Sequence, residues 1–112
     1  MPGTIDSGEP LFAVDTQQRI VSWNEAMEEL TGVEAEEAVG GRCWQVVGGA
    51  DLMGRPVCQL GCQYHDCIVQ GLTVGPRRVF VNTAWGRRRV LVSMLGVLDE
   101  EEPLVLHLLS EP

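Results

Sequence analysis

Lysine is absent from this chain of 112 residues, and all eight of its basic residues are arginines. Sixteen acidic residues outnumber them and give a formal net charge of −8 at pH 7. Because so acidic a surface repels the phosphate backbone, we expect no direct binding of nucleic acid. Five arginines nevertheless flank one predicted hairpin: Arg77, Arg78, Arg87, Arg88 and Arg89. They indicate either a solvated, protected strand edge or a docking surface for an acidic partner or the chain's own acidic helix.

Long apolar runs are also missing. No stretch approaches the roughly 20 apolar residues that a membrane-spanning helix needs. The segment from Met1 to Pro10 is small, polar and acidic, without the charged-then-apolar pattern of a secretion signal. We therefore expect a cytoplasmic protein with no membrane partner. The length and a hydrophobic content of 45% suit one folded domain with a modest core.

Catalytic motifs are the third absence. The chain has no Ser-His-Asp order, no phosphate-cradling loop and no prominent carboxylate pair. The glycines at positions 40, 41, 48 and 49 fit turns between short helices, and most acidic residues fall on predicted helix surfaces or in loops. The sequence therefore predicts that this domain is not an enzyme.

The most informative stretch runs from Leu11 to Gly32. Leu11–Val14 is apolar and predicts a strand, and a polar turn at 15–18 leads into Arg19–Trp23, which alternates as a half-buried strand does. Asn24 is placed to cap a following acidic amphipathic helix. Gly32 can adopt the left-handed conformation that ends such a helix.

The remaining pattern segregates helices from strands. Residues 1–10 predict a flexible tail, and residues 11–110 a single domain. Within the domain we expect short helices over 24–49, a loop over 50–56, a longer helix over 57–70, and strands over 77–84, 88–98 and 104–109. Two strands, then helices, then three strands predict an α+β fold with an antiparallel sheet.

This order resembles the opening of a PAS sensory domain. The residues that carry the resemblance are Asp15, Asn24, Ala26, Leu30, Thr31 and Gly32. Family members tend to continue with a short Glu-rich helix and a Gly-Arg-x-Cys segment. Here the corresponding stretches are the Glu-rich residues 34–38 and Gly40-Gly41-Arg42-Cys43. The resemblance extends from Leu11 to about Leu109, with a specific front half and a generic back half. It implies a five-stranded antiparallel sheet with short helices on one face.

The resemblance also implies a function. A PAS-like module would bind a small ligand or cofactor, of unknown identity, between the sheet and the helices over 34–69, with Trp44, Leu60, Tyr64 and Ile68 as pocket candidates. It would regulate a C-terminal effector in a longer bacterial protein, either a LuxR-type transcription regulator or a sensor histidine kinase.

We also expect a homodimer. Apolar residues at Ile5, Leu11, Phe12, Trp85 and along 88–98 give more apolar strand surface than one small core needs. The first strand and the outer face of the sheet are therefore the predicted sites of association.

Four cysteines form the other group of residues that could bind a metal or react: Cys43, Cys58, Cys62 and Cys67. They could bind zinc or an iron–sulfur cluster, form a redox pair, or be buried reduced thiols, and the C-x2-C pair of a zinc finger is missing. Cys58 and Cys62 lie one helical turn apart and are expected to be close. His65 lies beside the thiols and is a further candidate ligand. His107 alternates with leucines, which is typical of a satisfied core histidine.

The position of Cys43 agrees in part with the motif of light-sensing PAS relatives. Flavin-binding PAS relatives place a photoreactive cysteine after Gly-x-Asn, and Gly41-Arg42-Cys43 puts Cys43 in the corresponding position. The asparagine is absent, however, as is the Arg-Phe-Leu-Gln that follows the cysteine in that subfamily. Trp44 would also crowd a flavin. The sequence therefore argues against flavin photochemistry.

Overall fold

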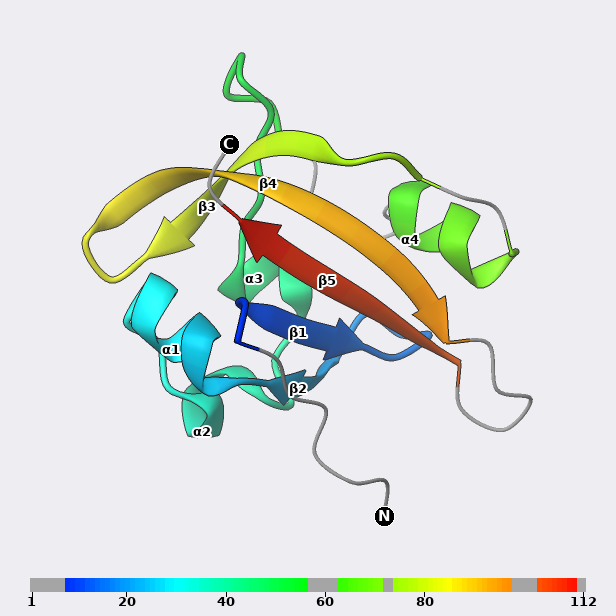
Figure 1. Ribbon diagram of the computed structural model, residues 1–112, viewed down its shortest axis with the longest axis horizontal. Coiled ribbons are helices and arrows are strands. Elements are labelled where there is room, and N and C mark those ends of the chain that lie inside the picture. The colour runs from blue at the N-terminus through cyan, green and yellow to red at the C-terminus, as the bar shows by residue number, and fades with distance from the viewer. Residues whose placement is uncertain (1–7, 57–62, 72–73, 98–102, 111–112) are drawn as a thin grey trace.

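The computed structural model describes residues 8–56, 63–71, 74–97 and 103–110. Five strands form one antiparallel sheet in the order β2-β1-β5-β4-β3 (Figure 1). The strands are β1 (Leu11–Val14), β2 (Ile20–Trp23), β3 (Arg77–Thr83), β4 (Gly86–Val97) and β5 (Leu104–Ser110). The helices are α1 (Glu25–Thr31), α2 (Ala35–Ala38), α3 (Cys43–Val46) and α4 (Gln63–Val69). The predicted α+β class and five-stranded sheet are confirmed.

Asn24 joins the first two strands to the first helix. Its Oδ1 accepts hydrogen bonds from the backbone N–H groups of Leu11 and Met27, each at 3.0 Å. Its Nδ2 donates to the carbonyl of Glu9 at 2.9 Å. The bond to Met27 is the predicted N-cap, and the bonds to Leu11 and Glu9 tie the same side chain to the start of β1. One buried amide therefore aligns three segments.

Gly32 ends α1 where the helix meets the β3–β4 hairpin. Its φ is 72°, and its N–H donates to the carbonyl of Glu28 at 2.8 Å, as expected of a left-handed helix end. A Cβ at this position would come within 2.8 Å of the Cβ of Ala84. The N–H of Ala84 donates to the carbonyl of Thr31 at 2.7 Å, so glycine permits both the turn and this close approach.

The strand registers decide which side chains face the helices. Phe12 pairs with His107 and Met94 pairs with His107 from the other side, so these three share the face that carries buried Val105 and Leu109. We call this the core face. Residues of all four helices pack on it, with α1 beside β3 and α4 beside β4 and β5 (Figure 1).

The opposite, outer face of the sheet is apolar and partly open. Along β4 it carries Leu91, Ser93, Leu95 and Val97, and Leu95 and Val97 are 53% and 45% exposed. The same face carries Arg78 near the start of β3 and Arg87 and Arg89 near the start of β4, by their pairing with Leu91, Asn82 and Phe80. These three arginines are exposed and make no ion pair with the acidic helices in the part of the chain that is described.

The structure corrects one sequence-based argument, on association, and describes only part of the long helix that was predicted. The association argument counted Leu11 and Phe12 as surface, but they are only 4% and 2% exposed, because β1 lies inside the sheet between β2 and β5. That part of the argument is wrong, and Ile5 lies outside the described residues. The long helix predicted over 57–70 is seen from Gln63 to Val69, and its first part also lies outside the described residues.

Replacing Asn24 by alanine should lower the free energy of unfolding by about 2 kcal/mol, because it leaves two N–H groups and one carbonyl without their partner. The control is Asn24→Asp, which keeps the accepting oxygen and loses the donation to Glu9. Urea denaturation at pH 7 should rank the wild type above N24D and N24D above N24A. Equal midpoints for the wild type and N24A would show that this amide does not hold the three segments together.

Candidate functional site

The imidazole of His107 is the unusual polar group of the core face. Its ring stacks on Phe12, with centroids 4.3 Å apart and an interplanar angle of 10°. Its Nδ1 is shielded from solvent and has no hydrogen-bond partner among the residues that the structure describes. The sequence pattern predicted a satisfied histidine here, and that prediction is wrong for Nδ1. Buried polar atoms are normally paired, so an unpaired one calls for an explanation.

Burial also controls the protonation of this histidine. The pKa of His107 is lowered from 6.5 to about 4: desolvation is the main cause, a backbone hydrogen bond with Val105 acts in the opposite direction, and the nearby His65 lowers the pKa to a lesser extent. The imidazole is therefore neutral at pH 7. A neutral imidazole has one donor nitrogen and one acceptor nitrogen, so the site offers a single directed hydrogen bond rather than a charge.

His65 occupies the adjacent part of α4 and has a structural role. The residue is buried, and its Nε2 lies 2.8 Å from the carbonyl oxygen of Asp15. Since a carbonyl can only accept, Nε2 carries the proton in this contact. Its Nδ1 lies 3.8 Å from a carboxylate oxygen of Asp66. His65 therefore fastens α4 to the turn between β1 and β2.

The cysteines are only partly described. Cys43 is buried at the start of α3, where its Sγ accepts a hydrogen bond from Nε2 of Gln18 at 3.7 Å, and Cys67 is partly buried on α4. Cys67 is a free thiol. Cys58 and Cys62 lie outside the described residues, so their predicted proximity stays a prediction. Among the side chains that the structure describes, no three potential ligands gather as a metal site would require.

Of the four predicted pocket residues, two are described in full. Ile68 of α4 is 4% exposed and belongs to the core. Trp44 of α3 packs at the edge of the core, and the guanidinium of Arg42 lies 5.8 Å from its ring centroid. Leu60 lies outside the described residues, and Tyr64 is described only in its backbone. The sequence argument missed Phe12 and Met94, the neighbours of His107 across the sheet.

A cavity of about 190 Å³ opens at the hairpin end of the sheet. Leu30 of α1, Arg88 and Val90 of β4, and Leu109 of β5 are among its lining residues. Leu109 is two residues from His107 on β5 and shares the core face with it. The cavity and the histidine therefore lie on the same face of the sheet, although His107 does not line the cavity.

The buried histidine makes stability depend on pH. Because the folded pKa of about 4 lies below the unfolded 6.5, the unfolded chain takes up the proton first as pH falls. The stabilisation is present above pH 6.5 and is lost as pH falls through 4, by about 3 kcal/mol at most. Denaturation of the wild type and of His107→Phe at pH 7 and pH 4 measures this loss.

The wild type should lose about 3 kcal/mol more than H107F between these pH values. Asp51, whose pKa is lowered mainly by the backbone N–H of Arg55, also responds to acid but is present in both proteins. Parallel pH dependence of the two proteins would show that His107 titrates normally.

Comparison with known proteins agrees with this geometry. A family model described as the PAS fold matches residues 6–42, about a third of the chain. No curated protein matches this chain.

No helix in the described part of the chain is long and apolar enough to cross a membrane.

Three solved structures share the whole fold. A PAS domain from Desulfitobacterium hafniense superposes with a TM-score of 0.71 at 12% identity, covering 95% of this chain and 94% of that one. The PAS domain of an HTR-like protein from Haloarcula marismortui gives 0.67 at 19%, covering 96% and 89%. The fungal blue-light photoreceptor Vivid gives 0.69 at 21%, covering 99% and 83%. The architecture of this chain is therefore that of the PAS fold.

Proposed function

We propose that this chain is a PAS-type sensory module that binds a small molecule on the core face of its sheet. It would pass the change to a C-terminal effector in a longer cytoplasmic protein of bacterial origin, a LuxR-type transcription regulator or a sensor histidine kinase. The observation that carries the proposal is that His107, which lies on the core face, has a shielded Nδ1 with no partner in the described part of the chain. A ligand that pairs with this atom would remove the cost of leaving it unsatisfied.

The core face has further features that suit a ligand. Val92 and Met94 share this face with His107, yet both are only partly buried, as is His107 itself. Helix α4, which covers this end of β4 and β5, has seven residues in the described region. Pockets in α+β domains are mostly apolar with a few placed polar groups, and this part of the core face has that composition.

The strand alternation suggests how binding would be transmitted. Met94 and His107 face the core layer, whereas their chain neighbours Leu95 and Leu106 face outward and pair with each other. A ligand that displaces β4 or β5 would therefore displace the outer face as well. A second copy of the chain, seated on that face, would sense the displacement directly.

The sensory function predicts a ligand that stabilises the chain. At ten times its dissociation constant, such a compound should raise the melting temperature by roughly 5 to 10 °C. A melting screen of small uncharged compounds, followed by an assay of effector output in the full-length parent, measures both effects. Compounds that raise the melting temperature should also change the output. If a stabilising compound leaves the output unchanged, the sensory proposal is wrong.

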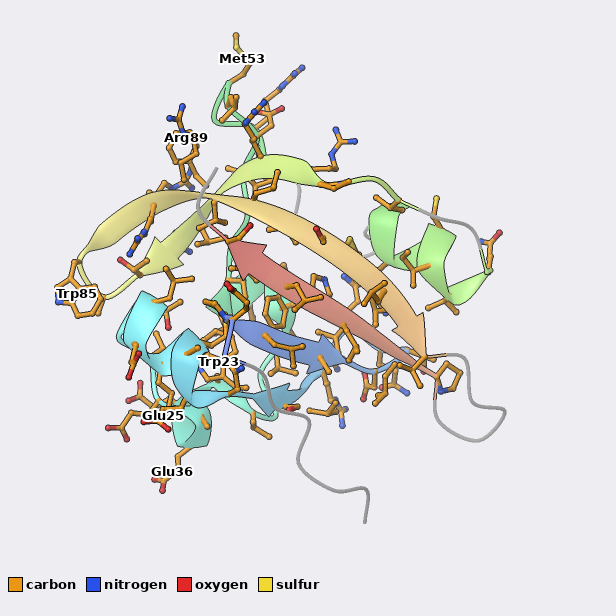
Figure 2. The ribbon with its side chains drawn as sticks, in the orientation of Figure 1. Trp23, Glu25, Glu36, Met53, Trp85 and Arg89 are labelled. Carbon is orange, nitrogen blue, oxygen red and sulfur yellow. The ribbon has the colours of Figure 1, made fainter. Side chains whose placement is uncertain are left out.

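The proposed homodimer predicts a response to charge on the outer face. Leu95→Glu should dissociate the dimer, because it places a carboxylate at an exposed apolar position of β4. Met53→Glu is the matched control, since Met53 is 80% exposed and points away from the sheet (Figure 2). Sedimentation velocity at several concentrations should show a dimer for the wild type and M53E and a monomer for L95E. A wild-type monomer at high micromolar concentration would contradict the proposal.

A further inference from the structure

Trp85 lies in the turn at the tip of the β3–β4 hairpin and is 75% exposed. Its backbone N–H donates to the hydroxyl of Thr83 at 3.1 Å. One edge of its ring rests on the end of α1, because a Cβ at Gly32 would lie 3.0 Å from the ring atom Cη2. Tryptophan and arginine are enriched among the residues that contribute most to protein–protein binding. An exposed indole that rests on a helix end is therefore a candidate contact.

Carboxylates line the α1 side of Trp85. Glu25 and Glu29 are exposed and lie four residues apart, so they share one face of the helix. Gly32, three residues further on, continues that row to the ring of Trp85. At 1.5 Å per residue, Glu25 lies roughly 10 Å from Gly32 along the helix axis. An acidic row therefore leads up to the indole.

Guanidinium groups line the other side of Trp85. Arg87 and Arg89 follow it by two and four residues, are exposed, and share the outer face of β4. At about 3.3 Å per residue, Arg89 lies roughly 13 Å from Trp85 along the chain. Figure 2 shows Arg89 above Trp85 and Glu25 below it, on the same side of the molecule. Opposite charges therefore flank one exposed indole at similar distances.

These opposite charges do not pair within the molecule. Among the residues that the structure describes, neither the two glutamates nor the two arginines form an ion pair. The sequence leaves open whether the arginines meet an external acidic partner or the chain's own acidic helix. Helix α1 packs on the core face, whereas Arg87 and Arg89 lie on the outer face. This placement favours an acidic partner on another molecule.

We propose that a second copy of this chain binds here, related to the first by a two-fold axis that passes near Trp85. The Trp85 stripe consists of Glu25, Glu29, Trp85, Arg87 and Arg89. A two-fold rotation places the glutamates of each copy opposite the arginines of the other and brings the two indoles together at the centre. Because the same patch serves both copies, the contact closes at two. The similar lengths of the acidic and basic arms suit such an axis.

This contact is separate from the outer-face homodimer and goes beyond the proposed sensory function. Leu95 and Val97 lie near the end of β4, whereas the stripe lies at its start. Exposed ion pairs contribute little each, and a net charge of −8 on each copy opposes association. The expected dissociation constant is therefore weak, about 1 mM. Since the Debye length is about 8 Å at physiological salt, the facing charges outweigh the more distant ones.

An exchange of charges tests the proposal. Leu95→Glu serves as the parent, because it removes the outer-face contact. In this parent, Arg87→Glu/Arg89→Glu makes the stripe entirely acidic, and Glu25→Arg/Glu29→Arg makes it entirely basic. Neither variant should associate with itself, because like charges face each other. An equimolar mixture of the two should associate as the parent does, since every facing pair is again of opposite sign.

The readouts are the ¹H–¹⁵N resonance of the Trp85 indole and the translational diffusion of the chain, followed up to about 2 mM, twice the expected dissociation constant. The parent and the mixture should show an indole shift that depends on concentration, with diffusion that slows towards that of a dimer and no further. Melting curves check that each variant folds. Because Glu25 lies in the first turn of α1, Glu29→Arg paired with Arg89→Glu repeats the exchange if E25R/E29R folds poorly.

Net charge alone predicts a different order. E25R/E29R makes the net charge less negative by four, and R87E/R89E makes it more negative by four. General repulsion would therefore let E25R/E29R associate with itself best, whereas the stripe predicts that it associates less than the parent. Trp85→Ser keeps every charge and should abolish the association.

Four results would overturn the proposal. They are self-association of E25R/E29R as strong as that of the parent, a mixture that stays monomeric, a parent or W85S that behaves like the other, and growth beyond two copies. The search for a stabilising ligand is independent of all four, so their outcome leaves the test of the sensory function unchanged.

Discussion

The hydrogen bonds of the Asn24 side chain are the constraint on which the rest of the domain depends. Asn24 is 5% exposed and makes hydrogen bonds to the start of β1, to the first turn of α1 and to the segment before β1. These bonds fix the direction in which the chain leaves the sheet. Helix α1 then reaches the β3–β4 hairpin, where Gly32 permits contact with Ala84. A local hydrogen bond therefore fixes the start of α1, and a long-range contact fixes its end.

On the core face, the unpaired nitrogen of His107 lowers the stability of the fold. A shielded nitrogen without a partner among the described residues reduces stability relative to an apolar ring of the same size. The lowered pKa adds a further cost once the pH falls below 6.5. A buried polar group that costs stability is typical of a functional site. Strand alternation then makes each inward contact of β4 and β5 the neighbour of an outward one, as in Met94 and Leu95. Recognition inside and association outside would share the same two strands.

The sequence predicts the local features well and the long-range ones less well. Asn24 as a cap, Gly32 as a helix end and the alternation of β3 depend on residues a few positions apart, and all three are confirmed. The burial of Leu11 and Phe12 depends on β1 lying between β2 and β5, a matter of topology that no local pattern encodes. The unsatisfied state of His107 likewise depends on its register with Phe12 and Met94. Its position on the core face could have been found from its spacing to Val105 and Leu109, but its missing partner could not.

The central claim is that a small molecule binds the core face at His107. The most direct measurement is a ¹H–¹⁵N correlation spectrum of the chain titrated with a set of small-molecule fragments. The account predicts shifts that concentrate on the amides of Phe12, Met94 and His107 and on α4, and that saturate. Shifts confined to the exposed outer face around Leu95 and Val97, or none at saturating concentrations, would contradict it.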